Sequence, residues 1–210
     1  NTISLKSALV KAGQVAASVI SNGQSTNSAM AAGKIAAEII SEGGTSNEAI
    51  ILGNVAADAV SNGMTVEEAV THARNYMRNV NVIKDLVQTS IQSQPEYSPL
   101  SVRTAQQLSV ELLEDGISRN NIIESSVKLS SIISRGYSQN EASIASKIYA
   151  QLRNEGYSVT VVDHAIESVL RMIGSISSID DLKTLATRSI DRINQGIPPS
   201  IVLLQSGQIY

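Results

Sequence analysis

The sequence contains no cysteine, phenylalanine or tryptophan, and it has only two histidines and six tyrosines. Without cysteine, the 210 residues form no disulfide, thiolate metal site or cysteine nucleophile. Two histidines are too few for a three-histidine zinc site. The net charge of −3 argues against nucleic-acid binding, which depends on a basic surface. No apolar run reaches the roughly 18 residues that suggest a membrane span.

Glycine recurs at intervals of 20 residues, three times in each half of the chain. Each of these glycines is followed two residues later by serine or threonine, which indicates an internal repeat. The six pairs are Gly23 and Ser25, Gly43 and Thr45, Gly63 and Thr65, Gly116 and Ser118, Gly136 and Ser138, and Gly156 and Ser158.

The Gly-x-Ser/Thr unit predicts the end of one helix and the start of the next. Glycine adopts the left-handed conformation just past a helix without a steric penalty. The hydroxyl side chain then accepts a hydrogen bond from a free N–H at the start of the following helix. Where glutamate comes three residues after the hydroxyl residue, as after Thr45, Thr65 and Ser138, the pattern is a full capping box.

Each repeat is therefore one helix of about 16 residues, and the short turns predict that consecutive helices run antiparallel. The fold class is all-α, with about nine helices, arranged either as a closed bundle or as an open stack. The expected ranges are 3–21, 26–41, 46–61, 66–92, 99–114, 119–134, 139–154, 159–173 and 179–194.

The proline-containing stretch 92–99 interrupts the repeat and suggests a boundary between two helical halves, residues 1–94 and 95–210. The second half ends in a proline-containing tail. Helices of the first half carry mid-helix glycines at Gly13, Gly33 and Gly53, each of which costs about 1 kcal/mol of helix propensity. We expect close helix–helix approach at these glycines to offset that cost.

No set of residues supports catalysis or cofactor binding, so we expect no enzyme, cofactor, metal or small-molecule substrate. His72 and His164 are candidate general bases, but we expect both to be solvated helix residues. The paired acids Glu67-Glu68 and Asp180-Asp181 fall in the first turns of helices, where the helix dipole stabilises negative charge.

Three further candidates have structural explanations or remain open. They are Asp163 beside His164, the phosphate-loop fragment Gly43-Gly44-Thr45, which the repeat explains, and the tyrosines Tyr137, Tyr149 and Tyr157. Of these tyrosines, we expect Tyr137 and Tyr157 to be apolar caps of their turns.

The Cys-free, Ser/Asn/Gln-rich composition and the turns Ser21-Asn22-Gly23 and Ser61-Asn62-Gly63 resemble the structured helical repeat domains of spider silk proteins. The resemblance covers roughly residues 13–173. The chain lacks the poly-Ala and Gly-Pro-Gly-rich runs of that family, and alanine is not dominant in it. The resemblance implies a secreted, extracellular module of a self-assembling fibre, whose partners are copies of itself or neighbouring repeats.

A second function fits the same sequence. Stacked antiparallel helices present a face that binds a peptide or protein, as helical solenoids do. If the chain is a scaffold of that kind, we expect a groove lined by varied, accessible side chains. Both functions predict no nucleic-acid or membrane partner.

Overall fold

The computed structural model describes residues 2–95, 97–176 and 178–208. Within them the chain forms ten α-helices and no strand, which confirms the all-α prediction. The helices and a final 3₁₀ turn are α1 (Thr2–Ser21), α2 (Thr26–Ser41), α3 (Ser46–Ser61), α4 (Val66–Gln92), α5 (Pro99–Glu114), α6 (Arg119–Ser134), α7 (Gln139–Asn154), α8 (Val159–Met172), α9 (Ile179–Asn194), α10 (Pro199–Gln205) and η1 (Ser206–Gln208). Helix α10 lies in the expected tail, where we predicted no helix.

The helices fall into two compact units, Asn1–Asn81 and Val82–Tyr210. The division lies inside α4, earlier than the predicted boundary at residues 94 and 95. The division falls inside α4 because the two ends of this helix pack in different cores. Ala69 and Ala73 of α4 pack in the core of the first unit, whereas Val87 and Ile91 pack in that of the second.

The glycine turns have the geometry that ends a helix. All six repeat glycines have positive φ, between 74° and 98°, and so does Gly196 at the end of α9. At Gly116 the next N–H, that of Ile117, donates to the carbonyl of Leu112 across the last turn of α5. This is the bond of a Schellman motif. Ile117 is buried, which supplies the apolar contact of that motif.

Hydroxyl side chains cap the helices that follow. Five of the six predicted residues accept a hydrogen bond from the backbone three residues on, and the predicted capping boxes form. The sixth, Ser158, lies at the start of α8 with extended backbone, but its side chain makes no capping bond. A further box, which sequence did not predict, links Ser98 and Ser101 at the start of α5.

This difference gives the first prediction. Ser138→Ala should lower the free energy of unfolding by about 1 kcal/mol, because the Glu141 N–H loses its hydroxyl acceptor and the Glu141 carboxylate loses its hydroxyl donor. Ser158→Ala is the matched control and should cost a few tenths at most, since no capping bond is lost. Urea denaturation of both variants measures the difference. An equal loss of stability would contradict the assignment.

The first unit packs small residues closely. Its core consists mostly of alanines from α2, α3 and α4, to which α1 adds Val15 and Val19. A Cβ atom placed on Gly33 would lie 3.3 Å from the carbonyl oxygen of Ala12, and one on Gly53 would lie 2.4 Å from Val15 Cγ1. The predicted close approach is therefore confirmed at Gly33 and Gly53. At Gly13 the prediction was wrong, because among the described residues no atom of another helix lies within 4 Å of such a Cβ.

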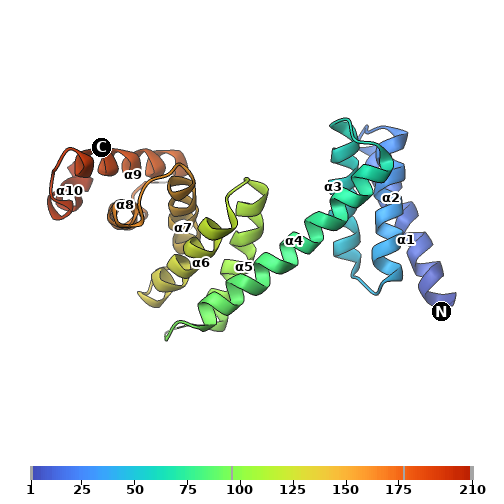
Figure 1. The fold of residues 1–210 in the computed structure, drawn as a ribbon, viewed down its shortest axis with the longest axis horizontal. Coiled ribbons are helices and arrows are strands. Elements are labelled where there is room, and N and C mark those ends of the chain that lie inside the picture. The colour runs from blue at the N-terminus through green and yellow to red at the C-terminus, as the bar shows by residue number, and fades with distance from the viewer. Residues whose placement is uncertain (1, 96, 177, 209–210) are drawn as a thin grey trace. The chain divides into compact units, whose positions relative to one another are not determined.

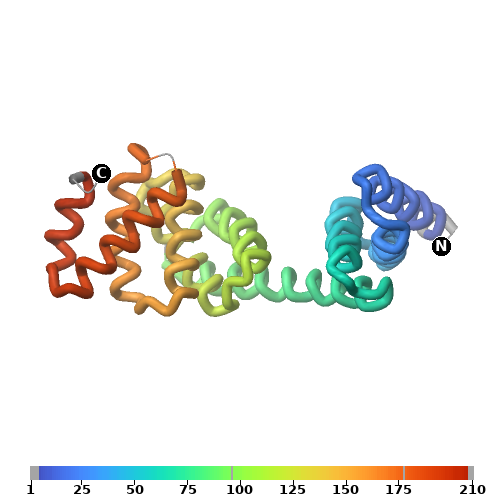
Figure 2. Tube along the Cα trace, turned by 90° about the horizontal axis from the view of Figure 1, so that it is seen from above, coloured from blue at the N-terminus to red at the C-terminus, as the bar shows by residue number. Residues whose placement is uncertain are grey.

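The helices of the second unit stack one on the next (Figures 1 and 2). Their core contains larger aliphatic side chains than that of the first unit. Here each of α5 to α8 packs on the helix that follows it, and α5 contacts α7, α7 contacts α9, and α8 contacts α10. Ion pairs also join alternate helices, as in Lys183–Glu155 at 2.7 Å between α9 and the end of α7. Within this unit the structure favours a stacked helical repeat over a closed bundle, because contacts run to the next helix and the next but one.

Candidate functional site

A groove of about 690 Å³ follows α6 in the second unit. Its floor is one face of α6, and its sides come from the end of α4, from α7 and from the start of α8. The lining residues are Ser90, Ser93, Gln94, Ile123, Glu124, Val127, Lys128, Ser131, Tyr149, Val159 and Asp163.

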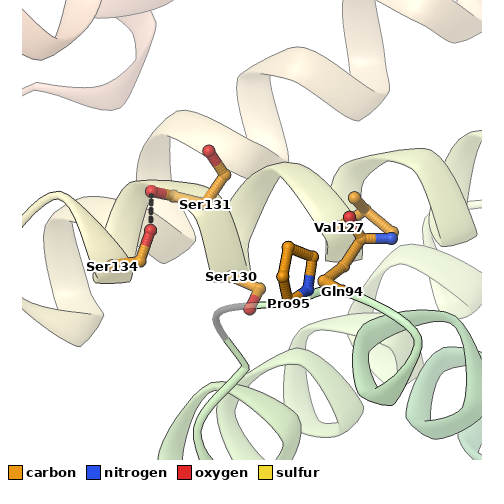
Figure 3. Close-up of a pocket in the computed structure, with 6 residues that line it drawn as sticks. All are labelled: Gln94, Pro95, Val127, Ser130, Ser131 and Ser134. Atoms are coloured by element: carbon orange, nitrogen blue, oxygen red, sulfur yellow. Dashed lines mark hydrogen bonds between the residues drawn. The ribbon is translucent and has the colours of Figure 1, made fainter.

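A smaller hollow of about 140 Å³ continues the groove along α6. Figure 3 shows Gln94 and Pro95 beside Val127 and Ser130, with Ser131 and Ser134 also on α6. The two hollows share Gln94, Val127 and Ser131. From Ile123 to Ser134 the helix face is therefore about 16 Å long at 1.5 Å per residue.

The α6 face follows from helical spacing. Ile123, Val127, Ser131 and Ser134 recur at intervals of four, four and three residues, which places them on one side of a helix. The opposite side holds Ile122, Leu129 and other buried residues in the core. Ile123 and Val127 remain partly accessible, so the groove floor is apolar at one end and rich in hydroxyl groups at the other.

The charged side chains that line the groove, Glu124, Lys128 and Asp163, are all in ion pairs, one of them with Arg153 outside the lining. Lys128 Nζ lies 2.5 Å from Asp163 Oδ1, which joins α6 to α8. Arg153 Nε donates to Glu124 at 2.9 Å, which joins α7 to α6. Each pair balances one positive and one negative charge. The groove therefore presents a nearly neutral surface to a ligand.

Tyr149 lies beneath these pairs. It is buried in the core, and the Lys128 ammonium is 5.6 Å from the ring centroid, within the range of a cation–π contact. Burial, followed by the negative charges of Asp163 and Glu124, raises the pKa of Tyr149 to about 12. The phenol therefore stays neutral at physiological pH.

The raised pKa predicts a pH dependence of stability. Because the folded phenol holds its proton more tightly than the unfolded one, the folded state binds more protons between about pH 10 and 12. The contribution of the protonated Tyr149 to the free energy of unfolding is fully present below pH 10 and is lost as the pH rises through 12. Tyr149→Phe should remove this part of the alkaline destabilisation. Urea midpoints at a series of pH values check it, and identical profiles for the two proteins would contradict it.

The structure places the candidates from the sequence as follows. His72 and His164 are both exposed on their helices. Asp180 and Asp181 are exposed in the first turn of α9. Glu68 forms a capping box with Thr65, whose hydrogen bonds lower the pKa of that carboxyl. Glu67 forms an ion pair with Lys34, in which Oε1 of Glu67 lies 3.9 Å from Nζ of Lys34.

Two of the candidate residues, Asp163 and Tyr149, do meet in the groove, while Tyr137 and Tyr157 pack against the edge of the core at their turns. Gly43, Gly44 and Thr45 form a helix end and a helix start. Sequence reasoning missed the accessible face of α6. The spacing of Ile123, Val127 and Ser131 was the available signal.

The described part of the chain shows no grouping of three or more acidic or histidine residues suited to a metal ion. Among the same residues, no helix is at once long and apolar enough to cross a membrane. Comparison with known proteins gives no matching family model, no matching curated protein and no matching solved structure.

Proposed function

We propose that the protein is a non-enzymatic helical-repeat scaffold that binds an extended segment of a partner protein along α6. The observation that carries the proposal is the groove of about 690 Å³, lined from four helices by varied side chains. Stacked helical repeats use such surfaces to bind their partners.

The chemistry of the groove indicates the kind of segment. An extended chain leaves its backbone N–H and C=O groups in need of partners, whereas a helix satisfies its own. The hydroxyls of Ser93 and Ser134 donate to helix carbonyls, and each keeps lone pairs free to accept from a ligand N–H. The roughly 16 Å face accommodates about five extended residues at ~3.3 Å each.

Side-chain preferences follow from the floor and the walls. Ile123 and Val127 offer apolar contact, so the segment should carry aliphatic anchors on alternate residues. The ion pairs Lys128–Asp163 and Arg153–Glu124 at the groove leave no excess charge of either sign. The partner segment is therefore expected to be low in charge.

Selection from a displayed peptide library tests this function. Wild-type protein should enrich short, weakly charged sequences with alternating aliphatic residues, and Val127→Lys used as the bait should not enrich them. Val82→Lys is the matched control, because Val82 is exposed on α4 and does not line the groove. Failure to enrich any shared pattern, or enrichment on all three baits alike, would overturn the proposal.

A second candidate is a secreted structural module of a self-assembling, silk-like fibre. It is supported by the low charge of α2 and α3, which carry only Lys34, Glu38, Glu48 and Asp58. Little repulsion opposes association of such surfaces. The aliphatic segments 29–40 and 121–133 would be available for strand pairing on partial unfolding.

Shearing concentrated protein in phosphate distinguishes the two candidates, since excluded salts strengthen apolar association. The scaffold is expected to remain helical and soluble by circular dichroism. Conversion to strand structure with insoluble threads would instead support the fibre module.

A further inference from the structure

An apolar stripe lies exposed along α1 in the first unit. Leu5, Leu9 and Ile20 are 60%, 62% and 49% exposed, and Gly13 lies between them. Their spacing of four, four and seven residues places all of them on one helix face. The opposite face buries Val15 and other small residues against α2 and α3. The stripe is therefore a packing face without a partner among the described residues.

The equivalent glycines of α2 and α3 show which kind of neighbour packs against this face. Gly33 and Gly53 occupy the positions of α2 and α3 that Gly13 occupies in α1. A Cβ on Gly33 would lie 3.3 Å from the backbone oxygen of Ala12, and one on Gly53 would lie 3.4 Å from that of Ala32. At each of them the backbone of the preceding antiparallel helix approaches the glycine. Gly13 has the same place in the repeat, and nothing lies within 4 Å of it.

We propose that this face binds α1 of a second copy of the chain, in an antiparallel pair that crosses at Gly13. The face is nearly symmetric about that glycine, with Leu9 four residues before it and Ala17 four after, and with Leu5 and Ile20 near its ends. A two-fold interface requires such self-complementarity. The pair extends the glycine-centred packing that α1, α2 and α3 already use.

Charge selects the antiparallel orientation. The charged side chains of α1 are Lys6 and Lys11. A parallel pair in register would bring the two copies of Lys6 together. In the antiparallel pair the two copies of Lys6 lie ~21 Å apart along the axis, beyond the screening length of about 8 Å at physiological salt. Lys11 lies two residues from Gly13 and therefore on another side of α1, away from the crossing. The proposal concerns the first unit and does not depend on the groove along α6.

Sedimentation equilibrium tests the association. Wild-type protein should show a reversible monomer–dimer equilibrium at protein concentrations up to about 1 mM, which is high enough to detect a weak dimer. Leu9→Glu should abolish the dimer. Leu204→Glu, which changes a 69% exposed leucine on α10, should leave it unchanged. A wild-type monomer throughout the range, or equal loss of the dimer in both variants, would overturn the proposal.

Disulfide trapping tests the orientation, because the chain has no cysteine of its own. Gly13→Cys should cross-link with itself, since the crossing brings the two backbones within reach of a disulfide. Leu5→Cys should not cross-link with itself, but a mixture of Leu5→Cys and Ile20→Cys should form the mixed dimer. Self-cross-linking of Leu5→Cys without the mixed product would overturn the antiparallel arrangement.

Discussion

Gly53→Ala is expected to lower the free energy of unfolding of the first unit by about 1–3 kcal/mol. The new Cβ would lie 2.4 Å from Val15 Cγ1, so the packed helices must move apart or Val15 must leave its preferred rotamer. Val15 is 4% exposed, which leaves its side chain little room to turn. The cost exceeds the gain of about 1 kcal/mol in helix propensity that alanine brings.

Gly13→Ala is the matched control for this prediction. It makes the same change at the same position of the repeat, but the added Cβ meets open space within the chain. Alanine should therefore stabilise α1 by up to about 1 kcal/mol. Urea denaturation at dilute protein concentration, followed by circular dichroism, compares the two. Equal effects of the same sign would contradict close packing at Gly53.

Gly136→Val is expected to destabilise the second unit by about 1–3 kcal/mol. Gly136 has a φ of 93°, in a region that a β-branched residue adopts only under strain. Among the described residues, a Cβ at this position would have no neighbour within 4 Å, so the added Cβ itself does not crowd the packing. The expected loss is thus a backbone effect of the turn between α6 and α7.

Gly174→Val separates this effect from the general consequences of replacing a glycine. Gly174 lies in the same unit and is exposed, and a Cβ placed on it would also have no atom within 4 Å, but its φ is not in the left-handed region. Its substitution should cost clearly less than that of Gly136. Thermal unfolding of both variants measures the difference. A similar drop in Tm would mean that the turn does not require the left-handed conformation.

Helix positions followed from the sequence because the signals that set them are local. Gly136 and Ser138 specify a stop and a start within three residues, and the structure has α6 ending at Ser134 and α7 beginning at Gln139. The seven-residue helix α10 escaped prediction because two prolines and a short length gave no periodic signal. Ser158 has the capping residue type and backbone, but the position of its side chain was not predictable from the spacing.

Packing between helices was less accessible to sequence reasoning. The three mid-helix glycines look alike in the sequence, but among the described residues only Gly33 and Gly53 receive a neighbouring helix. The groove along α6 depends on which helices flank Val127, and that is decided by contacts between residues 30 or more positions apart, such as Lys128 and Asp163. Asp163 and Tyr149 were recognised as polar or aromatic candidates, but their meeting beside Lys128 needed the structure.

Calorimetric titration of a selected peptide into three proteins tests the central claim, that the groove along α6 is a binding surface. Wild-type protein and Val82→Lys should bind with the same affinity, since Val82 lies outside the groove. Val127→Lys, at the middle of the floor, should weaken binding at least about tenfold, or ~1.4 kcal/mol, because it replaces an apolar contact by a charge. Undiminished binding by Val127→Lys would contradict the claim.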